Sequence, residues 1–478
     1  MSDRRVDVAV IGAGTAGLNA RSAAAKAGAS TVLIEGGTHG TTCARVGCMP
    51  SKLLIAAAEA AHGVADAGRF GIEVSGPVRV DGPAVLERVR RERDRFVGFV
   101  LDSVERIPRE GRLDGHARFV GPTSLEVEGH GRVDTRAVVL ATGSSPFIPP
   151  ALDAIREHVL VNDDVFELPD LPESLAVVGA GVIALELGQA FARLGVRVSI
   201  FARSQNFAGL TDPAVRESAA VVLGCELTIH RSVAIEVSGD PEAGFRVRWR
   251  TPDGAAGEES YQHVLAAAGR KANLAGLGLE RAGLALDARG RLAHDPATLQ
   301  VGSAPVFLAG DVTAEKAILH EAADEGRLAG ANAAHFPKLE SPARRAPLSI
   351  AFTEPQIAGV GARFADLDLA GARVGAVDYA DQGRARVMGR NAGVVRIYGE
   401  CGSGVLLGAE MVGPRVEHTA HLLAWAIQSG LTVDEALARP FYHPVIEEGI
   451  QTALRNLAAE LEHCPPREAG DLECGPGN

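Results

Sequence analysis

The sequence has no apolar run long enough to cross a membrane, since none reaches the roughly 18 residues that suggest a transmembrane helix. It also has no excess of positive charge. Its net charge of −12 argues against nucleic acid and anionic membranes as general partners. Arg4 and Arg5 precede a short apolar stretch, but no small-residue cleavage pattern follows them, so no signal peptide is expected. These absences predict a cytoplasmic protein that binds neither nucleic acid nor membrane.

Cysteine is also scarce. Six cysteines in 478 residues do not make a disulfide-stapled secreted scaffold. Cys43 and Cys48 form a close pair, which in the cytosol is more often catalytic or metal-binding than structural. No second pair has zinc-finger spacing, and His443 has no cysteine near it. We therefore expect no metal site.

The length and composition indicate a globular chain of several domains. A chain of 478 residues is too long for one ordinary core, so two to four domains are expected. The hydrophobic fraction of 46% and the charged fraction of 23% are typical of a globular protein.

A complete dinucleotide-binding pattern opens the chain. The apolar stretch 6–11 reads as a buried strand, and it leads into a glycine turn and an Ala-rich helix that ends near residue 28. A second apolar strand, 31–34, ends at Glu35. Glycines at 12, 14 and 17 let the backbone approach a pyrophosphate at the helix N-terminus, and Glu35 can accept hydrogen bonds from ribose hydroxyls. A merely tight strand–helix turn is the less favoured interpretation.

The same pattern returns in the middle of the chain. Residues 175–178 read as a strand, 179–184 as the turn, 186–194 as a helix and 196–201 as the returning strand. Ala184 occupies the third small position, which the pattern permits. The returning strand has no acid at its end, where Ala202 and Arg203 stand instead.

The two cysteines of the close pair are five residues apart, with Gly47 before the second and Pro50 after it. In a regular helix their Cα atoms would lie about 7.5 Å apart along the axis, at 1.5 Å per residue. A disulfide needs Cα atoms within about 7 Å. Gly47 and Pro50 supply the local irregularity that closes this gap. Two buried thiols that never pair are the alternative, but the fingerprint upstream and a His-Pro…Glu motif near the C-terminus favour redox chemistry.

The stretch 40–52 closely resembles the redox-active segment of the class I pyridine nucleotide-disulfide oxidoreductases, most of all the dihydrolipoamide dehydrogenase branch. The A-T-G-S turn at 141–144, the strand and Gly-Asp at 306–311, and the H-P-x-x-x-E motif at 443–448 resemble the same family. The resemblance implies an α/β fold with two Rossmann-like domains, for FAD and for NAD(P), and a C-terminal α+β dimerisation domain. The expected divisions are 1–150 (FAD domain with the disulfide), 151–272 (NAD(P) domain), 273–346 (return to the central domain), 347–463 (interface domain) and 464–478 (mobile tail).

The resemblance also implies roles for the two thiols and for a base. Cys48 lies against the flavin as the charge-transfer thiolate, and Cys43 is the outer thiol that exchanges with substrate. His443 shuttles the substrate proton, and Glu448 orients its imidazole. Glu447 is the competing orienter, one position off the motif. In the family this pair comes from the other subunit, so a homodimer is expected.

A lysine and a glutamate complete the expected catalytic set. Lys52 is expected near the flavin's reactive nitrogen, held by Glu186 at the start of the helix after the second glycine turn. The expected contacts with the two cofactors are made by Gly12, Gly14, Gly17, Glu35, Lys52, Thr142, Gly143, Gly310 and Asp311 for FAD, by Gly179, Gly181, Ala184 and Arg203 for NAD(P), and by Gly269 where the chain returns to the flavin domain.

The leading expectation is therefore a flavin-dependent disulfide oxidoreductase that passes two electrons between a dihydrolipoyl-type substrate, the cysteine pair, FAD and NAD(P). An NADPH-dependent reductase of another low-molecular-weight disulfide is the nearest rival. Mercuric reductase is less favoured because the tail lacks an adjacent cysteine pair; Cys464 and Cys474 are a weak candidate for a tail redox couple. A soluble transhydrogenase or a flavin-binding sensor is the further alternative, and neither would need Cys43, Cys48, His443 and Glu448 together.

Three positions depart from the commonest family pattern. Arg45 stands where an asparagine is usual and Thr41 where a glycine is usual. Ala202 removes the acid that repels a 2′-phosphate, and Arg203 offers one cation in its place. We expect relaxed coenzyme specificity with measurable NADPH use.

Overall fold

The computed structural model describes residues 4–205 and 207–464, and the chain divides into two compact units. Unit 1 contains residues 1–57, 81–171 and 265–344, and unit 2 contains the remainder. Helix α3 (Cys48–Ala65) and strand β14 (His263–Ala266) each cross a boundary between the units. Helix α4 (Gly82–Glu105) begins next to another boundary. Each unit is described by itself.

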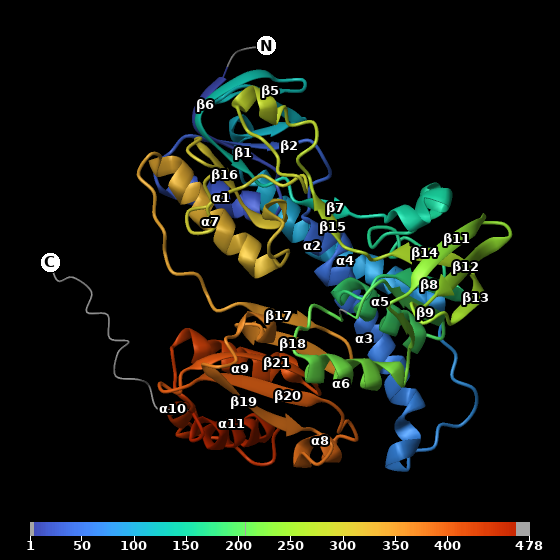
Figure 1. Ribbon diagram of the computed structural model, residues 1–478. Helices are drawn as coiled ribbons and strands as arrows, with labels where there is room; N and C mark the ends of the chain where they lie inside the picture. The colour runs from blue at the N-terminus through green and yellow to red at the C-terminus, as the bar shows by residue number, and fades with distance from the viewer. Residues whose placement is uncertain (1–3, 206, 465–478) are drawn as a thin grey trace. The chain divides into compact units, whose positions relative to one another are not determined.

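Unit 1 is built around a seven-stranded sheet in the order β3-β2-β1-β6-β5-β4, with β16 paired to β6 (Figure 1). Strands β1, β2, β3, β6 and β16 run parallel, and β4, β5 and β6 form an antiparallel meander. The strands are β1 (Arg4–Ile11), β2 (Thr31–Glu35), β3 (Arg112–Asp114), β4 (Ala117–Gly121), β5 (Ser124–Val127), β6 (Gly131–Leu140) and β16 (Val306–Leu308). The parallel order matches the sequence expectation of a doubly wound fold.

The central strands of unit 1 are buried on both faces. Val8 and Val10 of β1 belong to one apolar cluster, whereas Ala9 and Ile11 belong to another, as the two-residue period of a strand requires. Helices α1 (Thr15–Lys26) and α7 (Leu319–His335) cover the first of these faces. They approach closely through small residues: a Cβ on Gly326 would lie 2.2 Å from the carbonyl oxygen of Ala16.

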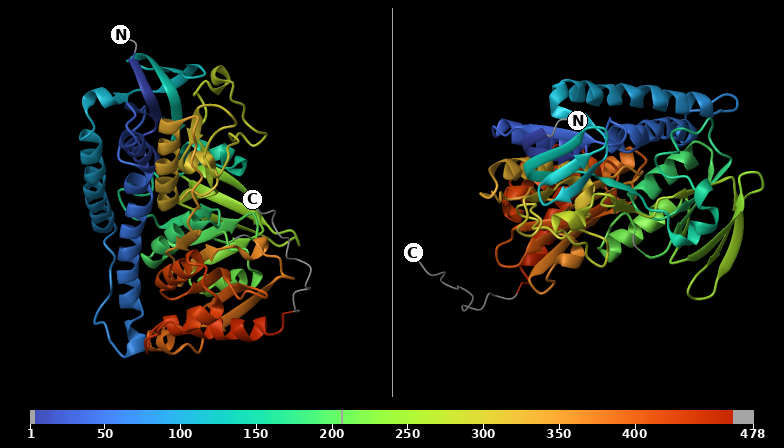
Figure 2. Two further views of the ribbon diagram at one scale, coloured as in Figure 1. Left: turned by 90° about the vertical axis from the view of Figure 1, so that its left-hand side faces the viewer. Right: turned by 90° about the horizontal axis from the view of Figure 1, so that it is seen from above.

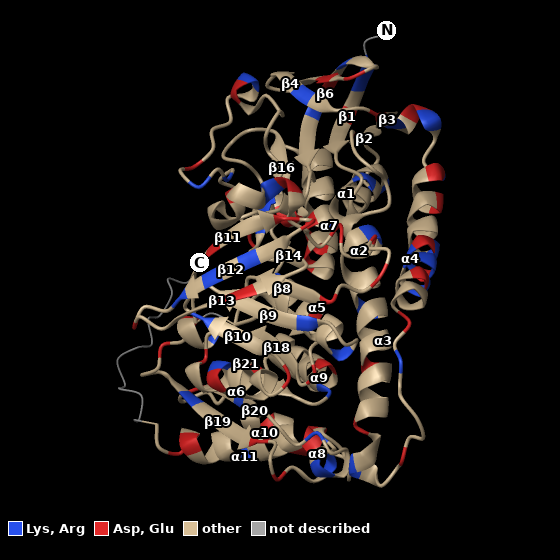
Figure 3. Cartoon of the chain, turned by 90° about the vertical axis from the view of Figure 1, so that its right-hand side faces the viewer, with Lys and Arg blue, Asp and Glu red and all other residues tan. Residues whose placement is uncertain are grey.

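Helix α4 (Gly82–Glu105) is the long helix seen lengthwise in Figure 2. Asp81 caps its first turn, and Leu86 and Val89 are buried on its inner side. Figure 3 shows charged residues along its length, as is typical of a helix with one face packed on the protein and the other exposed. The remaining elements of unit 1 are α2 (Thr42–Val46), the start of α3 (Cys48–Ala65), β7 (Ser144–Pro146), β15 (Arg270–Ala272) and the 3-10 turns η2 (Arg109–Gly111), η3 (Pro150–His158), η4 (Leu279–Ala282) and η5 (Gly310–Thr313).

Unit 2 contains the second nucleotide fold, a parallel sheet in the order β10-β9-β8-β14. A three-stranded antiparallel sheet in the order β11-β12-β13 follows it. The elements are β8 (Ser174–Val178), α5 (Val182–Arg193), β9 (Arg197–Ala202), α6 (Pro213–Gly224), β10 (Thr228–Arg231), β11 (Ala234–Asp240), β12 (Gly244–Arg250), β13 (Ala256–Tyr261) and β14 (His263–Ala266).

The C-terminal part of unit 2 is a five-stranded antiparallel sheet, β17-β18-β21-β20-β19, whose core includes residues of α9 and α11. The elements are β17 (Leu348–Ala351), β18 (Gln356–Gly361), η6 (Phe364–Asp366), β19 (Ala372–Asp378), α8 (Gly383–Val387), β20 (Val394–Glu400), β21 (Leu406–Gly413), α9 (Val416–Gln428), α10 (Val433–Leu437) and α11 (Glu447–Leu461). Unit 2 also contains η1 (Ala67–Phe70), which lies much earlier in the sequence. Two Rossmann-like folds and an α+β domain are thus present, which confirms the predicted fold class.

Several element boundaries differ from the sequence expectation. The helix after the second glycine turn begins at Val182, so Glu186 lies one turn inside it and does not open it. The expected tail 464–478 lies outside the described residues apart from Cys464. Across 4–205 and 207–464, no helix combines the length and hydropathy that a membrane span needs.

Candidate active site

The first glycine turn joins β1 to α1 by close backbone contacts. Gly12 has a φ of +106°, and a Cβ there would lie 2.3 Å from the carbonyl oxygen of Ala141. A Cβ on Gly17 would lie 1.8 Å from the carbonyl oxygen of Gly12. Gly14 is the N-cap of α1; it provides no side-chain cap, and a Cβ there would meet nothing within 4 Å. Two glycines therefore close the turn, and the third leaves open space in front of the helix amides.

Glu35 holds this turn from the end of β2. Its carboxylate accepts hydrogen bonds from the backbone N–H of Ala13 at 2.6 Å and of Gly37 at 2.8 Å. A carboxylate has about four acceptor positions, so capacity remains for ribose hydroxyls. Uncapped helix amides, open space at Gly14 and a positioned acid are the features that a dinucleotide pyrophosphate and ribose need. The residues present therefore fit FAD.

The second turn repeats this geometry in unit 2. Gly179 has a φ of +127°, and Gly181 is the N-cap of α5, again without a side-chain cap. A Cβ on Gly181 would also meet nothing within 4 Å. Ala184 is fully buried at the third small position. Arg203 is exposed just after β9, whereas Ala202 is buried. This turn also fits a dinucleotide.

The cysteine pair lies on two helices that break at Gly47. Cys43 is in α2, and Cys48 is the first residue of α3. Gly47 has φ −123° and ψ −115°, outside helical geometry. Pro50, expected to share in this irregularity, lies inside the first turn of α3, where proline is tolerated because its missing N–H would be unsatisfied there anyway. Pro50 has no N–H to donate to the carbonyl oxygen of Val46, four residues earlier and the last residue of α2, so Gly47 and Pro50 both interrupt the helix between the cysteines.

Thr41 shows why a glycine is usual at its position. Its φ is +61°, in a region that a β-branched residue seldom adopts. Its hydroxyl accepts a hydrogen bond from the N–H of Ala44 at 3.2 Å and so caps α2. Arg45, the other departure, donates to the carbonyl oxygen of Thr38 at 3.2 Å.

The structure holds Cys43 and Cys48 as hydrogen-bonded thiols. That bond, followed by burial, raises the pKa of the Cys43 thiol well above its usual value, and the charge of Lys52 opposes the shift. The Nζ of Lys52 also lies 3.4 Å from the Ser51 hydroxyl. Because exchange requires a thiolate, a dithiol in this state needs a base nearby.

A polar network surrounds Asp311, a residue expected to contact FAD. Ser144 donates to an Asp311 carboxylate oxygen at 2.7 Å, and Arg270 donates to the Ser144 hydroxyl at 2.8 Å. Arg270 also reaches Asn162 at 3.2 Å, and Asn162 donates to the carbonyl oxygen of Val46 at 2.9 Å. The network thus links the expected flavin site to the cysteine segment. Ser144 and Asn162 are not recognisable as site residues from the sequence, because their partners are distant along the chain.

Further expected residues of unit 1 lie around this network. The N–H of Gly310 donates to Glu325 at 2.8 Å, and Glu325 is buried. The Thr142 hydroxyl donates to the carbonyl oxygen of Asn273 at 2.7 Å, next to Gly143. Gly269 accepts from the N–H of Phe147 at 2.9 Å, just before β15 pairs with β7. These contacts bring the 142–147, 269–273 and 310–311 segments together within unit 1.

His443 and Glu448 form an exposed pair in unit 2. The Nδ1 of His443 lies 2.9 Å from a Glu448 carboxylate oxygen, and the other oxygen accepts from the N–H of Val445 at 3.1 Å. The His443 hydrogen bond, followed by that of Val445, lowers the pKa of the Glu448 carboxyl. The His443 side chain is 81% exposed. Glu448 rather than Glu447 therefore contacts the imidazole.

Glu186 belongs to a row of polar side chains on one face of α5. It accepts a hydrogen bond from the N–H of Phe352 at 2.9 Å. Gln189, one turn on, exchanges two bonds of 2.7 Å with the backbone of Glu354. Lys52 belongs to unit 1 and Glu186 to unit 2, so the expected pairing of these two side chains stays a prediction.

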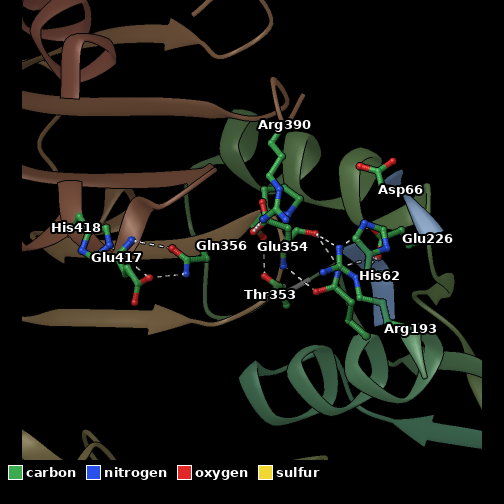
Figure 4. Close-up of polar contacts among 12 residues, drawn as sticks. His62, Asp66, Arg193, Glu226, Thr353, Glu354, Gln356, Arg390, Glu417 and His418 are labelled. Carbon is green, nitrogen blue, oxygen red and sulfur yellow. Dashed lines mark hydrogen bonds and ion pairs between the residues drawn. The ribbon is translucent and has the colours of Figure 1, made fainter. Parts of the chain in front are cut away.

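The same face of α5 continues into the ion-pair cluster of Figure 4. Arg193 binds Glu226 through two hydrogen bonds of 2.7 and 2.8 Å, and Arg390 binds the Glu354 carboxylate at 2.7 Å. Burial raises the pKa of Glu354, and the charges of Arg390 and Arg193 partly offset it. Each carboxylate in this cluster already has a cationic partner, so we assign it to holding the 352–356 segment in place.

A disulfide joins Cys401 to Cys464, 63 residues apart in the sequence. It connects the turn after β20 to the residues after α11. The tail couple of Cys464 with Cys474, a candidate from the sequence, is wrong because Cys464 is bonded to Cys401; Cys474 lies outside the described residues. In the described part of the chain, no group of three or more His, Cys, Asp or Glu side chains is arranged to hold a metal ion.

Comparison with known proteins agrees with this geometry. Residues 6–335 match the pyridine nucleotide-disulphide oxidoreductase family, and residues 348–454 match its dimerisation domain. The chain is 32% identical over 469 residues to a mercuric reductase of Streptomyces lividans, covering 95% of this chain and 97% of that protein. It is also 32% identical over 469 residues to dihydrolipoyl dehydrogenase 3 of Pseudomonas aeruginosa, covering 94% and 97%.

A solved structure shows the same fold. The HOCl-induced flavoprotein disulfide reductase RclA of Escherichia coli superposes with a TM-score of 0.78 at 22% identity, covering 95% of this chain and 99% of that one. The chain belongs to the pyridine nucleotide-disulphide oxidoreductases, a family of FAD-dependent enzymes that use NAD(P)H, and it carries their dimerisation domain.

Proposed function

We propose that this protein is a dihydrolipoyl dehydrogenase-like enzyme that passes two electrons between a dithiol/disulfide substrate, the Cys43–Cys48 pair, FAD and NAD(P). The exposed His443–Glu448 pair carries this proposal. Its imidazole presents one nitrogen to Glu448 and has the other available for proton transfer. A transhydrogenase or a flavin-binding sensor needs neither this pair nor the two hydrogen-bonded thiols.

The proposed exchange begins with Cys43 and Cys48 joined as a disulfide. His443 takes the proton of one substrate thiol, and the resulting thiolate attacks the sulfur of Cys43. The Cys43–Cys48 bond breaks, and Cys48 leaves as a thiolate. The second substrate thiol then attacks the mixed disulfide, which releases oxidised substrate and the Cys43 thiol. Substrate thus loses two electrons and two protons, and the cysteine pair gains the electrons.

The remaining electron transfer uses the two nucleotide sites. Bound FAD and NAD(P) supply the hydride chemistry, while the chain positions and orients them. The glycine turns at 12–17 and 179–184 would hold the pyrophosphates, with Glu35 on the FAD ribose. Asp311 and Lys52 would hold the flavin, and Glu186 would orient Lys52. In the sequence-based scheme Cys48 faces the flavin.

The active site is proposed to be shared in a homodimer. His443 and Glu448 lie inside the segment that matches the family's dimerisation domain. An 81% exposed imidazole at such a place suits a base that acts on the cysteine pair of a second copy. Mixing His443→Ala subunits with Cys43→Ser subunits tests this, because activity should reappear in the heterodimers formed from two inactive parents.

The thiol roles are tested by single substitutions. Cys48→Ser should abolish the long-wavelength absorbance band between thiolate and flavin. Cys43→Ser should keep the band while losing disulfide turnover. Cys225→Ser is the control, since Cys225 is an exposed thiol on no proposed path. A band that survives in Cys48→Ser and disappears in Cys43→Ser would reverse the assignment.

The base is tested in the same assay. His443→Ala should lose roughly 10²–10⁴-fold of turnover with lipoamide and retain bound FAD. Glu448→Ala should lose less, because it only orients the imidazole. Glu447→Gln is the matched control, since Glu448 holds the bond to His443. Near-normal turnover of His443→Ala would reduce the motif to a structural one.

A second candidate is an NADPH-dependent reductase of another disulfide, favoured by the lack of an acid at Ala202. The mercuric reductase relative adds a third substrate to test. A steady-state panel of lipoamide, glutathione disulfide and mercuric ion, each with NADH and NADPH, separates these. The main proposal is supported if lipoamide gives the highest kcat/KM. If another acceptor gives the highest value, that acceptor replaces lipoamide as the proposed substrate.

A further inference from the structure

The end of β9, at Ala202, has a cationic neighbour, Arg231, that lies 29 residues further along the sequence. In folds of this type the ribose of the dinucleotide lies beyond the second strand of the unit, which here is β9. Strand β10 pairs with β9 in parallel, and Arg231 is in register with Ala202. Neighbouring strands lie about 4.8 Å apart. Arg231 therefore stands at the same strand end as Arg203.

Arg231 also faces the side of the sheet that carries the nucleotide-binding helix. Phe201 and His230, the preceding register pair, stack at 4.9 Å on the opposite face. Because side chains alternate along a strand, Ala202 and Arg231 share the other face with Ile200. That face packs on α5: a Cβ on Gly188 would lie 3.1 Å from Ile200. The glycine turn and Arg231 thus belong to one side of the sheet.

Two contacts hold the loops after β9 and β10 side by side. The N–H of Val233 donates to the carbonyl oxygen of Ala202 at 3.0 Å. The side-chain amide of Gln205 donates to the hydroxyl of Ser232 at 2.9 Å. One backbone bond and one side-chain bond therefore join the segments that follow Ala202 and Arg231.

The guanidinium of Arg231 is partly engaged by an acid. Its Nη1 lies 3.0 Å from a carboxylate oxygen of Glu217 on α6. The Arg231 side chain is 29% exposed and that of Glu217 62%. A guanidinium has five N–H donors, so this pair leaves donors for a second anion.

We propose that Arg203 and Arg231 together bind the 2′-phosphate of NADPH, and that Glu217 weakens this site by competing for Arg231. The inference deepens the proposed function, on which it rests, by naming a coenzyme and a second specificity residue. Arginine suits this task because its planar fork matches phosphate. No acid stands at Ala202 to repel the phosphate.

The competing interpretation is an ordinary surface ion pair. Arg248 and Glu258 form such a pair in the antiparallel sheet of the same unit. Exposed pairs of this kind contribute little to stability. Arg248→Gln is therefore a matched control, because it removes the same charge and the same kind of pair away from the end of β9.

The test measures nucleotide binding to the FAD-loaded protein by calorimetry, with adenosine 2′,5′-bisphosphate compared with adenosine 5′-monophosphate. The parent should bind the bisphosphate more tightly. Arg203→Gln and Arg231→Gln should each weaken it roughly 10- to 100-fold and leave the monophosphate nearly unchanged. Glu217→Gln should strengthen it, and Arg248→Gln should match the parent. Arg231→Lys, which keeps the charge, should recover part of the loss.

These measurements need no disulfide turnover, so they fail or succeed independently of the proposed reaction. If the parent binds both nucleotides equally, the 2′-phosphate site is refuted. If Arg231→Gln behaves like Arg248→Gln, Arg231 has no part in it. A general loss of affinity for both nucleotides, with a lowered Tm, would make Arg231 a structural residue and also overturn the proposal.

Discussion

The two glycine turns of this protein have nearly the same backbone but different surroundings. Gly14 and Gly181 both cap their helices with extended geometry, at φ/ψ of −73°/−176° and −78°/−179°. Gly12 donates to β2 at 2.8 Å, and Gly179 donates to β9 at 2.9 Å. The pyrophosphate-binding geometry is therefore shared between the two sites.

The differences lie at the strand end and on the outer face of the helix. Glu35 ties the first turn to its strand, whereas Ala202 leaves the second strand end without an acid. Helix α1 packs on α7 through small residues, whereas α5 presents Glu186 and Gln189 to a polar segment. The two turns are therefore alike in the backbone that a dinucleotide pyrophosphate needs, and they differ in the side chains that surround it.

The largest expected effect comes from Gly17→Ala. Its Cβ would lie 1.8 Å from a backbone carbonyl oxygen, which no rotamer change relieves. We expect a loss above about 4 kcal/mol in unfolding free energy and little FAD-loaded protein. Tm and the ratio of flavin to protein absorbance measure it. A normal flavin ratio would show that the first turn is looser than described.

The next two variants test whether the glycine turns leave room for a cofactor, separately from how tightly the turns themselves pack. Gly14→Ala and Gly181→Ala place a Cβ in open space, so both proteins should fold with a Tm near the parent's. Gly14→Ala should weaken FAD binding, and Gly181→Ala nicotinamide binding, each about tenfold or more. FAD retention on a desalting column and the KM for the nicotinamide report the two losses. A loss of the wrong cofactor would reverse the assignment of the two turns.

A smaller effect is expected at the strand ends. Glu35→Gln replaces a carboxylate that accepts two backbone N–H groups, and we expect roughly 10- to 100-fold weaker FAD binding. Ala202→Glu installs the missing acid in the second unit and should lower kcat/KM for NADPH relative to NADH. The interpretation of Arg203 as a ligand of the 2′-phosphate would be contradicted by two results together. The parent would strongly prefer NADH, and Ala202→Glu would leave the ratio of kcat/KM for NADPH to that for NADH unchanged.

The smallest effect is expected at the third small position of the second turn. Ala184→Gly removes a buried methyl group and adds backbone freedom inside α5. It should cost about 1 kcal/mol of unfolding free energy and leave coenzyme binding unchanged. Denaturant unfolding measures it. A cost as large as that of Gly17→Ala would mean that the two turns are equally tight.

Both turns were predictable from the sequence because each is a local pattern of strand, glycines and helix. The break between Cys43 and Cys48 was also expected, because Gly47 and Pro50 both disfavour a continuous helix there. The start of α5 was misplaced because Val182 and Ile183 are β-branched and weak helix formers. Catalytic roles and domain boundaries remain predictions.

Other features could not be predicted because their partners are distant in the sequence. Arg231 reaches the end of β9 only through strand pairing. Asn162 contacts the segment before Gly47 across 116 residues. No period or spacing in one chain identifies such contacts.

The Cys401–Cys464 disulfide affects both the number of thiols that can react and the number of electrons that the protein can accept. With Cys401 and Cys464 joined, two of the six cysteines are silent to a thiol reagent. A preparation in which all six react has lost that bond, even if its flavin is intact. Opening it would also take up one electron pair more than the Cys43–Cys48 pair and FAD can hold. The number of electron pairs taken up by the end of a reductive titration therefore shows whether the Cys401–Cys464 disulfide is intact. That bond joins the residues after α11 to the turn after β20.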